Sequence, residues 1–266
     1  MILLKTTKLM KAFGGLIAIN KIDIEVPRGE IRGIIGPNGS GKSTFFNLIS
    51  GVYDPDPGSY IEFDGHDITN EPAHEIGALG LARTFQLLRL YQDMSVINNV
   101  MSGYHTRVPY SFTEAVLGRK KIWDKEKEIK DEMMELLSFV GLADFAEMNA
   151  SELSGGQRRL LVLARAIASK PKLLMLDEPA AGLSPHNIDN LMKIIMQLKD
   201  KFGLTLIIIE HILKVVMDTC DAVTVFDHGQ KIAEGTPAKV KDDNAVIEAY
   251  LGKKMNDDEM RKALAV

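Results

Sequence analysis

Short runs of apolar residues recur along the chain, and each is bounded by a glycine or by charged residues. The runs are IRGIIG (31–36), KLLMLDE (172–178), LTLIIIE (204–210) and AVTVF (222–226). An unbroken apolar run of this length is typical of a strand with both faces buried, as in a parallel sheet. The runs therefore predict the strands of a parallel β-sheet.

Longer segments near these runs repeat apolar residues at helical spacing. The apolar positions of one such helix, which is predicted to end near Gly203, are Ile188, Leu191, Ile194, Ile195 and Leu198. A second segment, SGGQRRLLVLARAIAS (154–169), is apolar on one side from Leu160 to Ala168. The alternation of strands and helices predicts an α/β core.

Two further segments alternate apolar and polar residues, which is typical of half-exposed strands. Their apolar positions are Ile22, Ile24, Val26, Ile61 and Phe63. We expect these segments to form an antiparallel sheet at one flank of the core. From about residue 87 to residue 150 the pattern turns helical, and the charges of DKEKEIKDEMMELLSFVGL (124–142) fit a solvated helix face. This region is predicted to be an inserted helical lobe.

Composition and charge narrow the classes of partner. The chain has 266 residues with 32 basic and 36 acidic side chains, and a net charge of -4 does not favour nucleic acid as a partner. Cys220 is the single cysteine, which excludes an intrachain disulfide and a multi-cysteine metal site and favours a reducing, cytoplasmic compartment. No apolar run approaches the roughly 18 to 20 residues that cross a bilayer, and residues 1–11 do not have the pattern of a signal peptide.

The clearest chemical motif is GPNGSGKS (36–43), which follows a predicted strand and precedes a helical segment. It fits the phosphate-loop pattern G-x-x-x-x-G-K-[ST], in which glycines let successive N–H groups point at phosphates. Lys42 brings a positive charge to the outer phosphates, and Ser43 is suited to ligate Mg²⁺. The residues predicted to bind nucleotide here are Gly36, Asn38, Gly39, Ser40, Gly41, Lys42, Ser43 and Thr44.

A second motif, NKID (20–23), resembles the guanine-reading sequence of GTPases. It lies before the phosphate loop and inside an alternating strand, whereas a guanine-reading loop should follow it. GTP specificity is therefore not supported.

Two predicted strands end in side chains that suit phosphoryl transfer. Asp177 and Glu178 close one strand and His211 follows another, and ligands of such sheets sit at the carboxyl ends of strands. One carboxylate can hold Mg²⁺ through water while the next polarises the attacking water. His211 can bond the terminal phosphate, although a lone histidine is more often structural. The other five histidines, which include His228, are assigned no role.

A second helix start, LSGGQ (153–157), also has the features of an anion site. Ser154, Gly155 and Gly156 offer a hydroxyl and unobstructed N–H groups at the positive end of a helix. The alternative is a well-capped helix with no ligand, in which Ser154 is the N-cap. Two adjacent glycines weaken a helix, which counts against that alternative.

Four features in this order resemble the ATP-binding cassette (ABC) ATPases: the phosphate loop, Gln86 in ARTFQ, LSGGQ, and LLMLDEP followed by His211. The resemblance covers nearly the whole chain. It implies a RecA-like phosphate-loop core with an antiparallel β flank and an inserted helical subdomain. It also implies that residues Ser154 to Gln157 bind the terminal phosphate of an ATP held by a second ATPase subunit, so that two subunits enclose two nucleotides.

Individual roles follow from the same resemblance. Phe13 matches the aromatic residue that stacks on adenine, and Gln86 matches the glutamine that contacts Mg²⁺ and the attacking water. Glu178 matches the catalytic base, with Asp177 as a metal ligand. Ser184 stands where the family usually has aspartate, which puts in doubt any contact that needs a carboxylate there.

The insertion, the segment LDEPAAGLSP (176–185) and the tail resemble the larger ATPase subunit of prokaryotic importers for branched-chain amino acids. Importers for urea and short amides, exporters, and soluble ABC proteins of translation or repair are the alternatives. The implied partners are transmembrane permease subunits at the cytoplasmic membrane face, a second ATPase subunit that is identical or homologous, and indirectly a solute-binding protein. Residues 87 to 104 are the predicted groove for the permease. Their apolar residues either receive a helix of the permease or pack the lobe's own core, and they are Leu87, Leu88, Leu90, Tyr91, Met94 and Val96.

The resemblance also divides the chain. The core and β flank are predicted at 1–86 and 166–250, the helical subdomain at 87–165, and a tail at 251–266.

Overall fold

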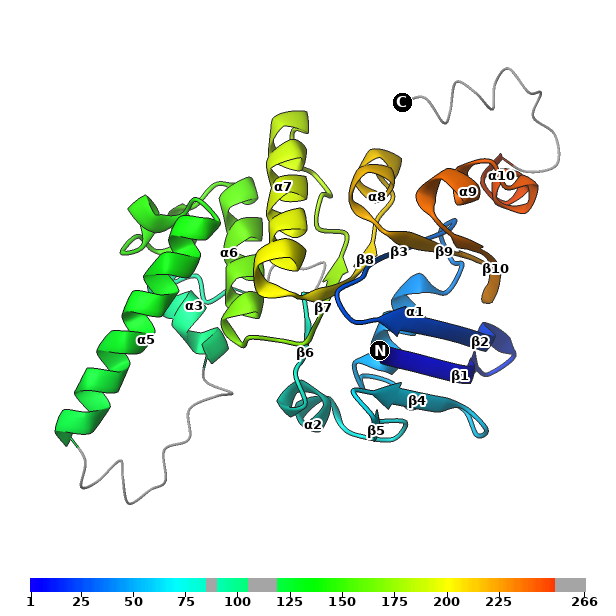
Figure 1. Cartoon of the computed structure of the whole chain (residues 1–266), viewed down its shortest axis with the longest axis horizontal. Coiled ribbons are helices and arrows are strands. Elements are labelled where there is room, and N and C mark those ends of the chain that lie inside the picture. The colour runs from blue at the N-terminus through cyan, green and yellow to red at the C-terminus, as the bar shows by residue number, and fades with distance from the viewer. Residues whose placement is uncertain (85–89, 105–118, 252–266) are drawn as a thin grey trace.

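In this computed structural model, which describes residues 1–84, 90–104 and 119–251, two sheets and two groups of helices build the chain (Figure 1). The larger sheet has the order β10 (Gln230–Gly235), β9 (Ala222–Asp227), β3 (Ile31–Ile35), β8 (Thr205–Ile209), β7 (Leu173–Asp177) and β6 (Leu81–Arg83). Neighbouring strands from β9 to β6 are parallel, and only β10 pairs antiparallel. Strands β3, β7 and β8 are buried at every position, so the predicted parallel core is confirmed.

The second sheet is antiparallel and has the order β2 (Leu16–Pro27), β1 (Ile2–Phe13), β4 (Tyr60–Phe63) and β5 (His66–Asp67). Ile22, Ile24 and Val26 are buried while the acidic residues between them are exposed, as the alternation predicts. The NKID sequence lies within β2, which agrees with its assignment to a strand.

Helix α1 (Lys42–Ile49) lies between the two sheets and supplies much of the core that joins them (Figure 1). Phe45 and Phe46 are fully buried there, and the ring of Phe45 meets Phe226 of β9 edge-on at 5.5 Å. The opposite face of the parallel sheet is covered by α7 (Pro185–Phe202) and α8 (Leu213–Thr219). Helix α7 ends at Gly203 in a left-handed conformation, where the sequence predicts its end.

The inserted region contains α3 (Val96–Tyr104) and α5 (Arg119–Phe139), which pack with α6 (Gly155–Ala168) at one end of the molecule (Figure 1). Two short 3₁₀ turns, η2 (Ala143–Phe145) and η3 (Ala150–Glu152), lead into α6. Apolar residues of these helices share one core with α7 and β7. The boundary predicted between residues 165 and 166 falls inside α6, and the division into subdomains stays a prediction.

The remaining helices are short. Helix α2 (Ala73–Ala78) precedes β6, and α9 (Pro237–Lys241) and α10 (Asn244–Leu251) follow β10. Within the described part of the chain, no helix combines the length and the apolar character that crossing a membrane requires.

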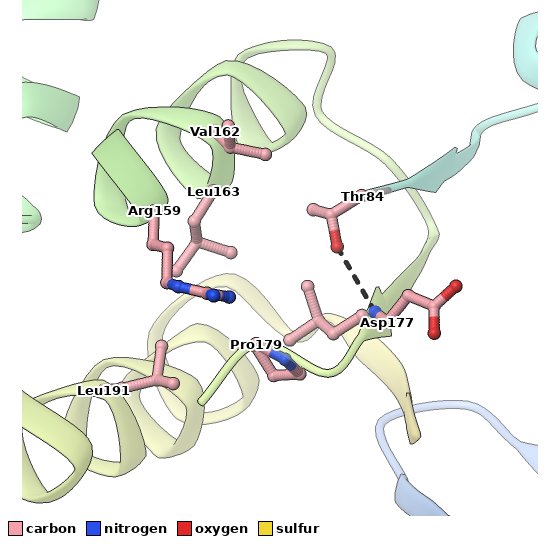
Figure 2. A pocket seen from close by; sticks show the side chains of 8 residues that line it. Thr84, Arg159, Val162, Leu163, Asp177, Pro179 and Leu191 are labelled. Atoms are coloured by element: carbon pink, nitrogen blue, oxygen red, sulfur yellow. Dashed lines mark hydrogen bonds between the residues drawn. The ribbon is translucent and has the colours of Figure 1, made fainter. Parts of the chain in front are cut away.

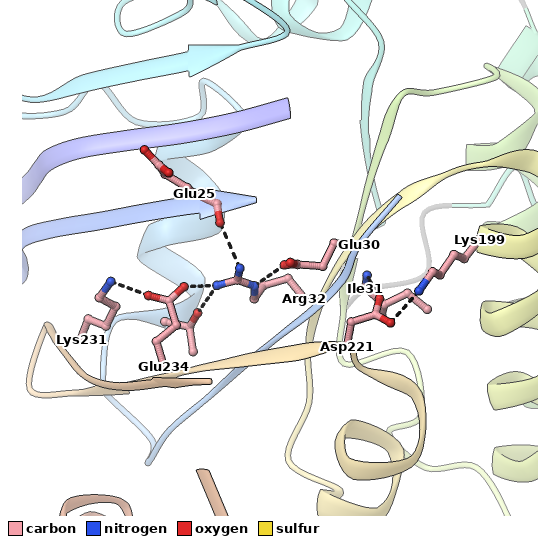
Figure 3. Close-up of polar contacts among 9 residues, drawn as sticks. Glu25, Glu30, Ile31, Arg32, Lys199, Asp221, Lys231 and Glu234 are labelled. Atoms are coloured by element: carbon pink, nitrogen blue, oxygen red, sulfur yellow. Dashed lines mark hydrogen bonds and ion pairs between the residues drawn. The ribbon is translucent and has the colours of Figure 1, made fainter. Parts of the chain in front are cut away.

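A buried arginine ties the two sheets together beside β3 (Figure 3). Arg32 donates hydrogen bonds to the Thr224 hydroxyl of β9 at 3.0 Å and to the Glu25 carbonyl of β2 at 3.0 Å. It also pairs with Glu30 and with Glu234 of β10. Because a buried cation is tolerated only with partners, this cluster fixes the flank sheet against the parallel sheet.

At Gly103 the backbone of α3 lies close to the backbone of α6, and this predicts a destabilising substitution. A Cβ atom at position 103 would lie 2.1 Å from the Arg165 carbonyl oxygen, so Gly103→Ala should push the two helices apart. Such overpacking costs about 1–3 kcal/mol, which exceeds alanine's advantage as a helix former. Urea unfolding checks this. Gly77→Ala in α2, where an added Cβ meets nothing within 4 Å, is the matched control and should be neutral or stabilising.

Candidate nucleotide site

A cleft of about 410 Å³ opens between the phosphate loop, the β1–β2 turn and the ends of β7 and β8. The sequence-predicted residues that line it are Phe13, Asn38, Gly39, Ser40, Gly41, Lys42, Ser43, Thr44, Glu178 and His211. These residues are far apart in the sequence. The parallel strands β3, β7 and β8 bring the phosphate loop, Glu178 and His211 together because the three strands end at the same edge.

The phosphate loop curls tightly against its neighbours. At Gly36, with φ of 150°, an added Cβ would lie 2.1 Å from the Phe226 carbonyl oxygen. At Gly41, with φ of 104°, it would lie 2.5 Å from the Ala18 carbonyl oxygen. There is therefore no room for a side chain at either position. With glycines there, the loop can fold back to the start of α1, and its backbone N–H groups can approach a bound phosphate closely.

Lys42 is held inside this loop and is 6% exposed. Its ammonium donates to the carbonyl oxygens of Gly36 at 2.7 Å and Pro37 at 2.9 Å. Burial lowers the pKa of Lys42, and the nearby carboxylates of Glu178 and Asp177 act against that shift. Among the described residues no carboxylate lies within ion-pair distance of this ammonium. Its charge therefore suits an anionic ligand.

The hydroxyls of Ser40 and Ser43 indicate whether the loop can bind a phosphate and a metal ion. The Ser40 Oγ atom is buried and has no hydrogen-bond partner among the described residues, which is costly unless a ligand or water supplies one. The Ser43 hydroxyl is exposed at the start of α1. The Ser40 hydroxyl, the Lys42 ammonium and the curled backbone of the loop thus fit the phosphate chain of a nucleotide. The Ser43 oxygen is the type of ligand that Mg²⁺ prefers.

Glu178 and His211 meet at the cleft. The Nε2 atom of His211 lies 2.9 Å from Oε1 of Glu178, and the backbone N–H of Glu178 donates to the Ile209 carbonyl at 2.9 Å. Glu178 has φ of 49°, in the left-handed region that a non-glycine residue rarely adopts. This conformation is typical of functional sites held by their surroundings.

Asp177 lies at the end of β7 but outside the lining of the cleft. Its Oδ2 atom accepts a hydrogen bond from Arg83 at 3.0 Å, and both side chains are buried. The backbone N–H of Asp177 donates to the Thr84 hydroxyl at 3.4 Å, beside a cavity of about 30 Å³ (Figure 2). Arg159 of α6 points into the same cavity and donates to the Glu178 carbonyl at 3.2 Å. Helix α6 thus contacts the backbone of Glu178 directly.

The mouth of the cleft is aromatic and apolar. Phe13 is 43% exposed and its ring meets Tyr53 edge-on at 5.4 Å, which leaves ring surface open to solvent. Sequence reasoning missed four other lining residues, Leu16, Ile17, Ala18 and His228. His228 lies in the β9–β10 turn, next to the phosphate loop, and its having no assigned role stays a prediction. The N–H of Gly229 in the same turn donates to the Ser40 carbonyl at 3.1 Å.

A contact from the C-terminal helix also escaped the sequence analysis. Tyr250 of α10 lies beside the backbone of Gly36, the first residue of the phosphate loop. Burial raises the pKa of Tyr250 to about 12. No motif in the sequence places residue 250 beside residue 36.

The second helix start has the geometry of a capped helix. The Ser154 Oγ atom accepts from the Gln157 N–H at 3.3 Å, and the Gln157 side chain accepts from the Ser154 N–H at 2.9 Å. Ser154 and Gly155 are exposed, and an added Cβ at Gly155 would meet nothing within 4 Å. Among the described residues that line the cleft, none comes from 153–157. This helix start is therefore capped by its own residues, exposed to solvent, and not part of the cleft of its own chain.

Two further positions complete the predicted site. Gln86 lies outside the described residues, and its role stays a prediction. Ser184 is the N-cap of α7, where its hydroxyl accepts from the Asn187 N–H at 3.4 Å. A serine can fill this capping position without a carboxylate.

A second concavity, of about 490 Å³, lies between β6, α3 and α6. We call it the lobe groove, and its lining includes Leu90, Tyr91, Ser102, Gly103 and Arg165. Of the apolar residues in this region, Leu90 and Val96 are buried in the lobe's own core, which was one of the two alternatives. Tyr91 is 55% exposed and Met94 is also exposed, while Leu87 and Leu88 lie outside the described residues.

Comparisons with known proteins agree with this arrangement. Residues 19–181 match the family model of the ABC transporter, and residues 230–254 match that of the branched-chain amino acid ATP-binding cassette transporter. The chain is 37% identical to the high-affinity branched-chain amino acid transport ATP-binding protein BraF of Pseudomonas aeruginosa over 94% of this chain and 98% of that protein. It is 41% identical to a probable branched-chain amino acid transport ATP-binding protein, LivG, of Archaeoglobus fulgidus over 94% and 95%. The ADP conformation of MJ1267, an ATP-binding cassette of an ABC transporter, matches with a TM-score of 0.81 at 34% identity over 95% of this chain and all of that one.

Proposed function

The chain belongs to the ABC transporter family as an ATP-binding subunit, and we propose that its ATP turnover drives import of branched-chain amino acids through membrane permease partners. The observation that carries the proposal is the juxtaposition of the phosphate loop with Glu178 and His211 in one cleft. The match of residues 230–254 to the branched-chain model supports the choice of cargo.

In this proposal ATP lies along the cleft with its adenine on the exposed ring of Phe13. The triphosphate reaches the loop N–H groups and Lys42, and the unpartnered Ser40 hydroxyl gains a bond. Mg²⁺ would neutralise charge on the phosphate oxygens, and Ser43, Asp177 and Gln86 are the residues assigned to hold it. Because Asp177 lies behind the cleft lining, a water molecule is expected to bridge it to the ion.

Glu178 and His211 are assigned to the hydrolytic step. Glu178 orients and deprotonates the attacking water, and His211 contacts the terminal phosphate. Their 2.9 Å contact holds the two side chains at one end of the cleft before nucleotide enters.

The open helix start at Ser154 is assigned to a second ATPase subunit, which is either another copy of this chain or a homologue. Its exposure and its separation from its own cleft support this assignment. ATP would then bridge two subunits, and the closed pair would reopen after hydrolysis because ADP lacks the terminal phosphate.

The lobe groove is assigned to the permease. Tyr91 and Arg165 face each other there, with the guanidinium 5.9 Å from the ring centre. Burial lowers the pKa of Arg165, and no carboxylate among the described residues pairs with it. We expect the permease segment to present an acidic side chain to this cation. Such docking would place the chain at the cytoplasmic face of a membrane.

Transport measurements test the proposed function. The chain, its permease and a solute-binding protein in vesicles should hydrolyse ATP faster when leucine, isoleucine or valine is supplied, and the vesicles should accumulate that solute. Arg165→Glu should abolish this stimulation while the isolated chain still binds ATP. Stimulation by urea or short amides and not by the amino acids would instead select the alternative cargo. Copurification with ribosomes or DNA and no membrane protein would contradict transport altogether.

A further inference from the structure

Glu210 is a buried carboxylate directly behind the reactive end of the cleft. It follows β8, is 2% exposed, and is one residue before His211. Sequence reasoning treated it only as the end of an apolar strand. Burying a carboxylate costs several kcal/mol unless donors replace its water shell, so its partners define its role.

Three backbone N–H groups supply those partners. Oε1 of Glu210 accepts from Ala180 at 2.6 Å, and Oε2 accepts from His211 at 3.1 Å and from Ile212 at 3.4 Å. Burial raises the pKa of Glu210, and these three N–H groups act against that shift. Hydrogen bonds to an ionised acceptor are roughly twice as strong as neutral ones.

The two oxygens therefore hold two different loops. Ala180 lies two residues after Glu178 in the loop that follows β7, while His211 and Ile212 belong to the loop that follows β8. Two other contacts lie nearby. The Glu178 N–H donates to the carbonyl of Ile209 at the end of β8, and the His211 ring contacts the Glu178 carboxylate. Glu210 is the side chain whose two oxygens are divided between the two loops.

We infer that Glu210 is a positioning residue, which sets Glu178 against His211 by anchoring the backbone of both loops. The inference rests on the roles proposed above for Glu178 and His211. Glu210 is not among the residues that line the cleft and is not expected to contact the nucleotide, so its loss should slow the chemical step and leave ATP binding nearly unchanged.

Glu210→Gln tests this with little change of shape. The amide has one acceptor oxygen, and its NH₂ group would face an N–H donor, so one loop loses its anchor. We expect kcat to fall by about 10- to 100-fold, as displacements near 1 Å at a reacting centre can cost this much. The Kd of a fluorescent ATP analogue should change less than about twofold. Glu234→Gln, at a carboxylate of the Arg32 cluster that does not line the cleft, is the matched control and should keep wild-type kcat.

A double variant separates positioning from a general loss of stability. If Glu210 acts through Glu178, then Glu178→Gln/Glu210→Gln should have the same residual turnover as Glu178→Gln alone. Multiplied losses in the double variant, or wild-type kcat in Glu210→Gln, would overturn the inference. A wild-type protein that does not hydrolyse ATP with its partners would instead remove the proposed function.

Amide hydrogen exchange of the wild-type protein provides a measurement that needs no variant. The amides of Ala180, His211 and Ile212 should exchange slowly because each is bonded to the buried carboxylate. Rapid exchange at these three positions, while β7 and β8 stay protected, would refute the anchoring.

Discussion

Replacing Glu178 by glutamine is expected to lower ATP turnover at least about 100-fold, the range in which general bases contribute, while ATP still binds. The amide cannot accept the proton of the attacking water. It does preserve the size of the side chain and an oxygen within reach of His211, so the cleft should keep its shape. Because ATP would enter and remain intact, the bridged pair of subunits should accumulate.

Three measurements check this prediction. Phosphate release in the presence of permease gives turnover, a fluorescent ATP analogue gives affinity, and light scattering gives the mass with and without ATP. Glu135→Gln, an exposed carboxylate of α5, is the control and should behave as wild type. A Glu178→Gln protein that stays monomeric with ATP and partner present would contradict the two-subunit site, and one with wild-type turnover would contradict the assignment of the base.

The fold was largely predictable because its strands and helices differ in local pattern. Strand β8 is buried at every position and is apolar from Leu206 to Ile209, while α7 repeats apolar residues at helical spacing. The local pattern of apolar residues therefore distinguishes a strand buried on both faces from a helix buried on one. The lobe groove was predicted less well. Leu90 and Tyr91 are adjacent and both apolar in character, yet one is buried and the other exposed, because α3 and α6 decide which side faces the core.

The candidate site was predictable only where residues carry their chemistry in a local motif. Gly36 and Lys42 were found in this way. His228, Tyr250 and Glu210 were not, because their positions near the cleft depend on how distant parts of the chain pack together. Tyr250, for example, is placed by the packing of α10, and neither its neighbours nor its spacing encodes a contact with Gly36.

Two inactive variants are expected to restore each other's activity if the sites are shared between chains. Lys42→Ala should lose ATP affinity, because it removes the buried ammonium from a loop built around it. Ser154→Arg should bind ATP in the isolated chain and fail in hydrolysis, because the bulky cation occupies the open helix start. Loss of the serine cap costs only about 1 kcal/mol, so this exposed substitution should not prevent folding.

In a two-fold dimer of one copy of each variant, one site combines the intact Lys42 of one chain with the intact Ser154 of the other. Random pairing makes half of the dimers mixed, each with one intact site, so the mixture should regain up to about a quarter of wild-type turnover. Phosphate release from the mixture with permease is the measurement, and light scattering verifies that pairs form. If mixed dimers form and remain inactive, Ser154 acts within its own chain. A large loss of ATP affinity in Ser154→Arg alone would point the same way, because a residue outside its own cleft should not change binding by the monomer.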